Sequence, residues 1–187
     1  GFVYQSSQTA SAEESEAGQV KIHNVEQGSE EWFKLRLGIP SASRFKDLLT
    51  PTGKPSASSD KYLNELLAER LSGKRFETFK SHWMQRGNDL EPEAAGVFWL
   101  QEDLHCREIG LVTNDSMTVG CSPDRIVGDG MLTGLEIKCP SPGVHTAYLR
   151  EYAKSGAMPS EYYAQVQGTM WLMGFSDYYF MSYHPDL

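Results

Sequence analysis

The stretch CSPDRIVGDGMLTGLEIK, residues 121–138, decides the fold. It holds two β-prone runs, 125–127 and 132–138, separated by an Asp-Gly dipeptide that favours a tight hairpin turn. Further short β-prone runs with turn residues between them precede it from about residue 107. We therefore predict an antiparallel meander from there to the end of the stretch.

The register of this hairpin places acidic side chains close together. A two-residue turn puts Asp124 opposite Leu135, one register step from Glu136, and a β-bulge at Gly134 could absorb that step. Glu136 and Lys138 are two residues apart on one strand, so their side chains point to the same face. We expect two carboxylates and an ammonium group to converge on one spot.

This group of side chains suits phosphodiester hydrolysis. The carboxylates of Asp124 and Glu136 and the backbone carbonyl of Ile137 are hard oxygen ligands that suit Mg²⁺. The ion would neutralise phosphate charge and lower the pKa of an attacking water, which Lys138 would orient or deprotonate. The alternative is a surface ion pair of Glu136 and Lys138 with no catalytic role.

The rest of the chain alternates helices with strands. Helices before and after a small, mixed central β-sheet predict an α/β (α+β) fold, with a kink or restart expected at Pro92. Capping residues and apolar periodicity predict helices over 30–37, 41–49, 60–72, 83–100, 144–154 and 160–173, and a last strand over 178–183.

Composition divides the chain into two parts. Residues 1–20 are rich in Ser, Gln, Ala and Glu, and are expected to be a flexible tail or a cloning remnant. Residues 21–187 are expected to form one nuclease-type domain. No apolar run approaches the ~18–20 residues that span a bilayer, and no signal peptide is recognised. We expect a cytoplasmic protein without membrane association.

Charge and cysteine content argue against several classes of protein. A net charge of −8 argues against a passive DNA-binding protein, although a metal-dependent nuclease needs clustered carboxylates. The three scattered cysteines argue against a disulfide framework and against a zinc or iron–sulfur site. The sequence has no Gly-rich phosphate loop, nucleophile elbow or dinucleotide fingerprint to support a metabolic α/β enzyme.

Six short motifs follow one another along the chain. They are Trp32-x-x-Leu35-Arg36-Leu37-Gly38, Ser41-Ala42-Ser43, Arg86-Gly87 with Glu91, Cys121-Ser122-Pro123-Asp124, Leu135-Glu136-Ile137-Lys138-Cys139-Pro140 and Tyr163-Ala164-Gln165-Val166-Gln167. In this order they resemble the phage lambda exonuclease family, the YqaJ-like viral recombinases of the PD-(D/E)xK nuclease superfamily.

The resemblance implies a restriction-endonuclease-like core and magnesium-dependent 5′→3′ exonuclease digestion of double-stranded DNA ends, with Mn²⁺ as an alternative ion. It also implies a ring-shaped homotrimer in a bacterial or phage-infected cell. The 3′ single-stranded overhang would pass to a single-strand annealing protein in DNA recombination.

The resemblance also implies roles for single residues. Asp124 and Glu136 match metal-binding carboxylates, and Lys138 matches the catalytic lysine. Glu91 matches an acidic residue that is a candidate ligand for a second metal or its waters, and Gln165 matches a helix glutamine that faces the site. Their alternatives are a carboxylate at a helix N-terminus and a polar residue on a half-buried helix face.

A second cluster is suited to binding phosphate. Helix N-terminal N–H groups and the hydroxyls of Ser41 and Ser43 attract phosphate, and the Arg36 guanidinium can grip it bidentately. The resemblance implies that Arg36 and Ser43 contact the 5′-terminal phosphate of the digested strand. Ser122 is a further candidate for contact with DNA phosphate. The alternative is a capping serine beside a solvated arginine.

Two departures from the family pattern and two competing functions remain at this point. Asn114 stands where the family has a further acidic residue, and the resemblance suggests additional C-terminal strands and a helix after Leu187. A related endonuclease or single-strand nuclease could use the same core. A structure- or end-binding DNA module without hydrolysis is the alternative from another class.

Overall fold

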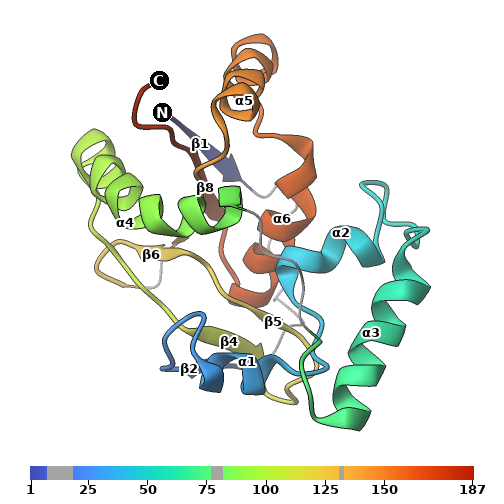
Figure 1. Ribbon diagram of the computed structural model, residues 1–187. Coiled ribbons are helices and arrows are strands. Elements are labelled where there is room, and N and C mark those ends of the chain that lie inside the picture. The colour runs from blue at the N-terminus through green and yellow to red at the C-terminus, as the bar shows by residue number, and fades with distance from the viewer. Residues whose placement is uncertain (8–18, 77–81, 131–132) are drawn as a thin grey trace.

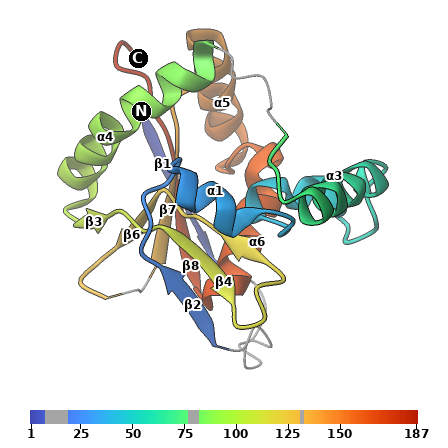
Figure 2. The ribbon, with the colours of Figure 1, turned by 60° about the horizontal axis from the view of Figure 1, so that its bottom comes forward.

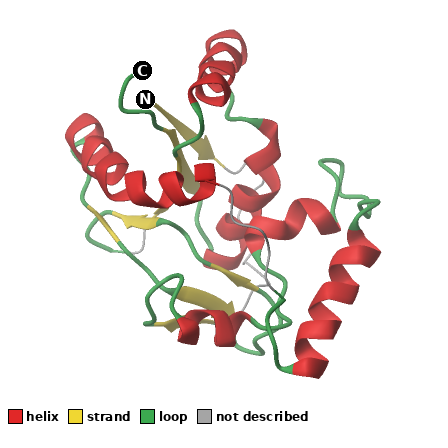
Figure 3. Ribbon diagram, viewed as in Figure 1, coloured by secondary structure: helices red, strands yellow, loops and turns green. Residues whose placement is uncertain are grey.

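The computed structural model of the chain describes residues 1–7, 19–76, 82–130 and 133–187 (Figure 1). Its strands form two β-sheets, one of five strands and one of three, with helices packed around them (Figure 3). This arrangement confirms the predicted α/β fold with a mixed sheet flanked by helices. Within the described ranges, no helix is long and apolar enough to cross a membrane.

The larger sheet has the strand order β1-β8-β7-β6-β3. Strands β7 and β8 run parallel, whereas the other neighbouring pairs are antiparallel. Helical segments between β7 and β8 supply the crossover that parallel strands require. The strands are β1 (Phe2–Ser7), β3 (Cys106–Arg107), β6 (Arg125–Val127), β7 (Thr133–Lys138) and β8 (Asp177–Ser182).

The smaller sheet changes the meander predicted from the sequence. Strands β4 and β5 pair with each other, and so do β6 and β7, but the two pairs belong to different sheets. The break between the pairs contains Pro123, whose nitrogen has no hydrogen to donate to a strand ladder. The strands of the smaller sheet are β2 (Val20–His23), β4 (Leu111–Asn114) and β5 (Gly120–Cys121).

The helices lie close to their predicted positions, with three differences. The segment predicted as one helix over 160–173 begins with a 3₁₀ turn, η2, before α6. The long helix α4 continues through Pro92, so the structure shows no restart there. The segment predicted as one helix over 41–49 is a 3₁₀ turn, η1, followed by the one-turn helix α2. The bounds are α1 (Glu30–Arg36), η1 (Ala42–Arg44), α2 (Phe45–Leu48), α3 (Ser59–Ser72), α4 (His82–Glu102), α5 (Pro142–Ser155), η2 (Ser160–Tyr162) and α6 (Tyr163–Met173).

Ser29 and Ser41 each precede a helical segment, but their side chains make different contacts. Ser29 caps α1 as predicted, because its hydroxyl accepts a hydrogen bond from the backbone N–H of Trp32 at 3.2 Å. Ser41 makes no side-chain cap. Its hydroxyl instead contacts Arg36 and Ser43. The Ser41 hydroxyl therefore belongs to a polar cluster with Arg36 and Ser43.

Buried side chains cover both faces of the larger sheet. Tyr178 and Phe180 of β8 belong to a cluster with α6, whereas Met181 and Leu135 belong to a second cluster with α4. This division follows from the alternation of side chains along a strand. Tyr178 packs so closely on Gly134 that a Cβ there would lie 2.5 Å from its ring.

The N-terminal segment corrects the prediction of a flexible tail over residues 1–20. Residues 2–7 form β1, which pairs antiparallel with β8 along the edge of the larger sheet. Phe2 and Ser6, on the same face of β1, are buried, and Phe2 stacks on Tyr152 with ring centroids 4.7 Å apart. Backbone pairing and the aromatic contacts of Phe2 with Tyr152, Phe180 and His145 hold a segment whose composition looked unstructured. Residues 8–18 lie outside the described residues.

Candidate active site

The β6–β7 hairpin brings Asp124 and Glu136 together without a bulge. Val127 pairs with Thr133 and Arg125 with Leu135, so the next step of this register sets Asp124 opposite Glu136. The prediction of a two-residue turn was wrong by one position, because the connection between the strands spans five residues. Asp124 is fixed by a hydrogen bond that its Oδ2 accepts from the Ile137 N–H at 2.7 Å.

Glu136 is an almost completely buried carboxylate, 1% exposed. Burial, and then the negative charge of Asp124, raise the pKa of Glu136 to about 7. Lys138 and Gln165 both donate hydrogen bonds to its Oε1. The Gln165 amide comes from α6, so this helix holds the carboxylate in place from the side opposite the hairpin.

Lys138 lies between the two carboxylates. Its Nζ contacts Glu136 and is 3.9 Å from Asp124 Oδ2, and it lies 5.5 Å from the centre of the Tyr162 ring. Burial alone would lower the pKa of the Lys138 ammonium, but the charges of Glu136 and Asp124 outweigh it and raise that pKa. Lys138 is therefore a cation in this arrangement and donates hydrogen bonds.

Glu91 reaches the site from α4, on another face of the sheet, and is paired with Arg125. Arg125 is only 6% exposed, and its Nη1 donates to Glu91 Oε1 at 2.5 Å and to the Asp124 carbonyl at 2.6 Å. Its Nη2 lies 3.4 Å from Glu108. Burial and the charge of Asp124 raise the pKa of Glu91, while Arg125 opposes that shift.

The donor set fits a magnesium ion, although in the described part of the chain no group of three His, Cys, Asp or Glu side chains is arranged around one point. Mg²⁺ commonly uses only one or two carboxylates and keeps several waters. Asp124 and Glu136 supply the carboxylates, and the Ile137 carbonyl shares a strand edge with the N–H that binds Asp124. Beyond burial, the negative charge of Asp124 raises the pKa of Glu136, and a cation held by the two carboxylates would relieve that repulsion.

The second predicted cluster is also brought together. Arg36 Nη2 donates to Ser41 Oγ at 3.0 Å, and the Ser41 and Ser43 hydroxyls are 3.0 Å apart. The Arg36 guanidinium lies 3.9 Å above the centre of the Trp32 ring, and the Trp32 indole N–H donates to Ser122 Oγ at 3.1 Å. A chain of contacts therefore joins the predicted phosphate cluster to the Ser-Pro-Asp segment.

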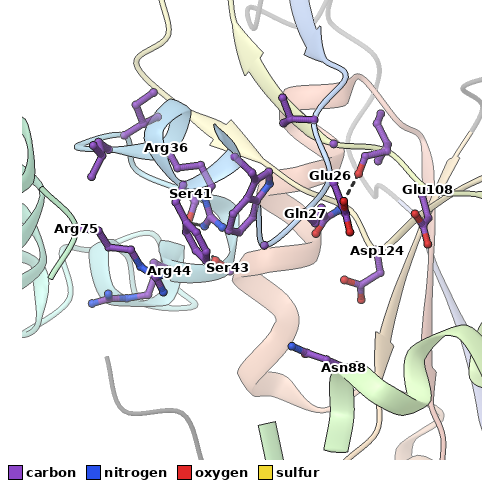
Figure 4. A pocket seen from close by; sticks show the side chains of 18 of the residues that line it. Glu26, Gln27, Arg36, Ser41, Ser43, Arg44, Arg75, Asn88, Glu108 and Asp124 are labelled. Carbon is purple, nitrogen blue, oxygen red and sulfur yellow. Dashed lines mark hydrogen bonds between the residues drawn. The ribbon is translucent and has the colours of Figure 1, made fainter. Parts of the chain in front are cut away.

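The two clusters line one small cavity, and a larger cavity shares part of its lining. A small cavity of about 210 Å³ is lined by Asp124, Glu136, Lys138 and Gln165, and also by Arg36, Ser41, Ser43 and Ser122. Arg36, Ser41, Ser43 and Asp124 also line a cavity of about 950 Å³ beside it. In Figure 4 the larger cavity has a basic side, with Arg36, Arg44 and Arg75, and an acidic side, with Glu26, Glu108 and Asp124.

Comparisons with known proteins agree with this geometry. A family model described as the YqaJ-like viral recombinase domain matches residues 31–176. The chain is 36% identical to an alkaline exonuclease, LHK-Exo, from Laribacter hongkongensis, with a TM-score of 0.72 over 85% of this chain and 76% of that one. The structure of LHK-Exo in complex with dAMP gives the same values. A phage-related exonuclease from Haemophilus somnus 129PT, 19% identical with a TM-score of 0.54 over 73% of this chain and 64% of that one, shares the fold. No curated protein matches the chain.

The chain belongs to the YqaJ-like viral recombinase family. This confirms the resemblance found in the motifs, and the matched range contains every residue of both clusters. Within this YqaJ-like domain, sequence reasoning missed Arg125 and Arg75. The signal for Arg125 was a charged residue inside a short apolar β-run, directly after Asp124. Arg75 gave no signal, because it follows the end of α3 and meets the cavity wall through its contact with the distant Phe33 ring of α1.

Proposed function

We propose that the protein is a magnesium-dependent exonuclease that digests one strand of double-stranded DNA in the 5′→3′ direction from an end. The product would be a 3′ single-stranded overhang for phage-type recombination. One observation carries this proposal: Asp124, Glu136 and Lys138 line the same small cavity as Arg36, Ser41 and Ser43.

Nuclease activity is supported by the family and by the 36% identity to an alkaline exonuclease. The side chains in the small cavity suit the same chemistry. Two carboxylates and a cation at one point are what phosphodiester hydrolysis needs, because negative charge develops on the phosphate as the attacking water approaches.

Each residue named around Glu136 has a task in the proposed mechanism. Asp124, Glu136 and the Ile137 carbonyl would hold Mg²⁺, or Mn²⁺ in its place, and Glu91 would contact the waters of the ion. When bound, the ion would neutralise charge on the scissile phosphate and lower the pKa of the attacking water. Lys138, as an ammonium ion, donates a hydrogen bond that orients this water. Gln165 holds the Glu136 carboxylate in the orientation that binding requires.

The basic side accounts for dependence on a DNA end. Arg36, Ser41 and Ser43 would bind the 5′-terminal phosphate, with Ser122 near the next phosphate towards the acidic side. Charged guanidinium donors form strong, directional hydrogen bonds with phosphate oxygens. An anchor at the 5′ terminus fixes which phosphodiester reaches Asp124 and Glu136, and so fixes the direction of digestion.

The proposal extends to the assembly and its partners. As the family resemblance implies, we propose a ring-shaped homotrimer that encircles the DNA and passes its overhang to a single-strand annealing protein. Its place of action would be the cytoplasm of a bacterial or phage-infected cell. Sedimentation of the protein with and without duplex DNA measures the stoichiometry directly.

The deciding experiment is a gel assay with Mg²⁺ on three DNA substrates. These are linear duplex with 5′-phosphate, linear duplex with 5′-hydroxyl and covalently closed circular duplex, each with wild type and with Lys138→Ala. We expect wild type to degrade the phosphorylated linear DNA selectively, and the variant to bind it without cutting. Cleavage of the circle would instead identify an endonuclease. DNA binding by wild type without any cleavage would identify an end-binding module.

A further inference from the structure

Helix α1 holds two guanidinium groups at one wall of the larger cavity. Arg36 lies over the Trp32 ring, and the guanidinium carbon of Arg75 lies 3.6 Å from the centre of the Phe33 ring. The two rings are neighbours on α1, with centroids 4.9 Å apart in an edge-to-face arrangement. Both arginines line the cavity, and Figure 4 shows Arg75 on the same side as Ser43.

The positive charges of Arg36 and Arg75 repel each other. Burial is the largest cause that lowers the pKa of Arg36, to about 10, and the positive charge of Arg75 contributes to this lowering. In the described part of the chain, neither guanidinium lies within 4.0 Å of a carboxylate. The nearby Glu69 instead accepts a hydrogen bond from the Gly38 N–H at 3.1 Å. Two like charges held together by stacking favour an anion between them.

Arg44 provides a contrast on the same wall. It is ion-paired with both Asp47 and Glu65 and stacks on Tyr62. Its charge is therefore compensated within the protein. The unpaired positive charge at this end of the cavity comes from Arg36 and Arg75, next to the hydroxyls of Ser41 and Ser43.

We propose that Arg75 joins Arg36 in binding the terminal phosphate monoester of DNA, and that this pair selects a DNA end by its charge. A terminal monoester carries about −1.5 to −2 at pH 7, whereas an internal phosphodiester carries a single negative charge. Two guanidinium groups balance the charge of the monoester, and the aromatic rings beneath the guanidinium groups fix the orientation of the guanidinium planes. This inference rests on the proposed function, since it adds a residue to the proposed 5′-phosphate anchor.

The test measures binding to DNA ends without divalent metal, so hydrolysis does not intervene. Linear duplexes carry a 5′-phosphate, its methyl ester or a 5′-hydroxyl, and fluorescence anisotropy gives the dissociation constant of each. The methyl ester keeps the phosphorus and loses one negative charge. Wild type should prefer the phosphate to the methyl ester by about tenfold, the effect of one charged hydrogen bond.

Three variants isolate the contribution of Arg75. Arg75→Gln should bind the phosphate and its methyl ester equally, and Arg75→Lys should keep part of the preference because it keeps the charge. Arg70→Gln removes an exposed arginine of α3 that does not line the cavity and should behave as wild type. Circular dichroism checks that each variant is folded.

The outcomes separate this inference from the proposed function. If wild type prefers the phosphate and Arg75→Gln retains that preference, Arg75 is not part of the anchor, and the proposed function stands. If wild type shows no preference among the three ends, the proposed 5′-phosphate anchor fails, and this inference fails with it.

Discussion

The pKa of Glu136 predicts how magnesium binding depends on pH. Burial and the charge of Asp124 raise this pKa from 4.5 to about 7. A carboxyl group binds Mg²⁺ only after it loses its proton, so protons and Mg²⁺ compete for Glu136. The affinity should therefore rise as the pH rises through 7, in a range where an ordinary carboxylate no longer titrates.

The magnitude follows from the ionised fraction of Glu136. With a pKa of about 7, about a tenth of the protein carries an ionised Glu136 at pH 6 and about nine tenths at pH 8. The dissociation constant for Mg²⁺ should fall about tenfold over that interval, with about one proton released per ion bound at pH 6. A pKa of 4.5 would give a change of less than about 5%.

The same shift affects the stability of the metal-free protein. Between pH 4.5 and 7 the folded protein keeps a proton on Glu136 that the unfolded chain has lost. The free energy of unfolding should therefore fall as the pH rises through this window. Bound Mg²⁺ offsets the loss at higher pH, because it binds the folded form.

Isothermal titration calorimetry in two buffers of different ionisation enthalpy measures both the affinity and the proton release. Glu136→Gln should abolish Mg²⁺ binding. Glu108→Gln is the matched control, because Glu108 is an exposed carboxylate that lines the larger cavity and not the small one. Its titration should follow the wild-type pH dependence. An affinity that stays constant from pH 6 to 8 without proton release would refute the assignment of Glu136 as a buried metal ligand.

Two further predictions concern stability and use urea denaturation as the measurement. Tyr178→Phe should raise the free energy of unfolding by about 1 kcal/mol, because the buried Tyr178 hydroxyl has no hydrogen-bond partner among the described residues. Tyr148→Phe should lower it by about 1 kcal/mol, because the Tyr148 hydroxyl donates to a carboxylate, and equal effects of the two changes would contradict this reasoning. Arg125→Met should lower the free energy of unfolding by about 3 kcal/mol, because it leaves the Glu91 carboxylate without its cation, and adding Glu91→Gln should restore part of that loss. If the effects of the two changes simply add, Arg125 and Glu91 are not energetically coupled.

The sequence predicted the active-site hairpin well because its functional residues lie close together along the chain. Asp124, Glu136 and Lys138 lie within fifteen residues, and strand alternation alone fixes the shared face of the last two. The exact register was missed by one residue because the connection is longer than its Asp-Gly dipeptide suggested. Such a difference depends on packing against the neighbouring strand β8, which the hairpin sequence does not contain.

Features that depend on distant partners were not predictable in this way. Strand β1 was missed because the polar residues that follow it dominate the composition of residues 1–20, and because its partner β8 lies at the other end of the chain. Arg125 and Glu91 meet across thirty-four positions. The division of the strands between two sheets also follows from such long-range pairing, with β2 joining β4 across about ninety residues.

The two sides of the larger cavity are encoded in separate segments of the chain. The basic side comes from residues 32–75, and the acidic side, apart from Glu26, comes from residues 91–125. Figure 2 shows the same separation in space, with α3 standing apart from β6 and β7. A chimera that takes residues 32–75 from a relative should therefore acquire a new choice of DNA terminus while keeping its hydrolytic chemistry. Recognition and cleavage can then diverge independently in evolution, because they are modular in the gene as well as in the fold.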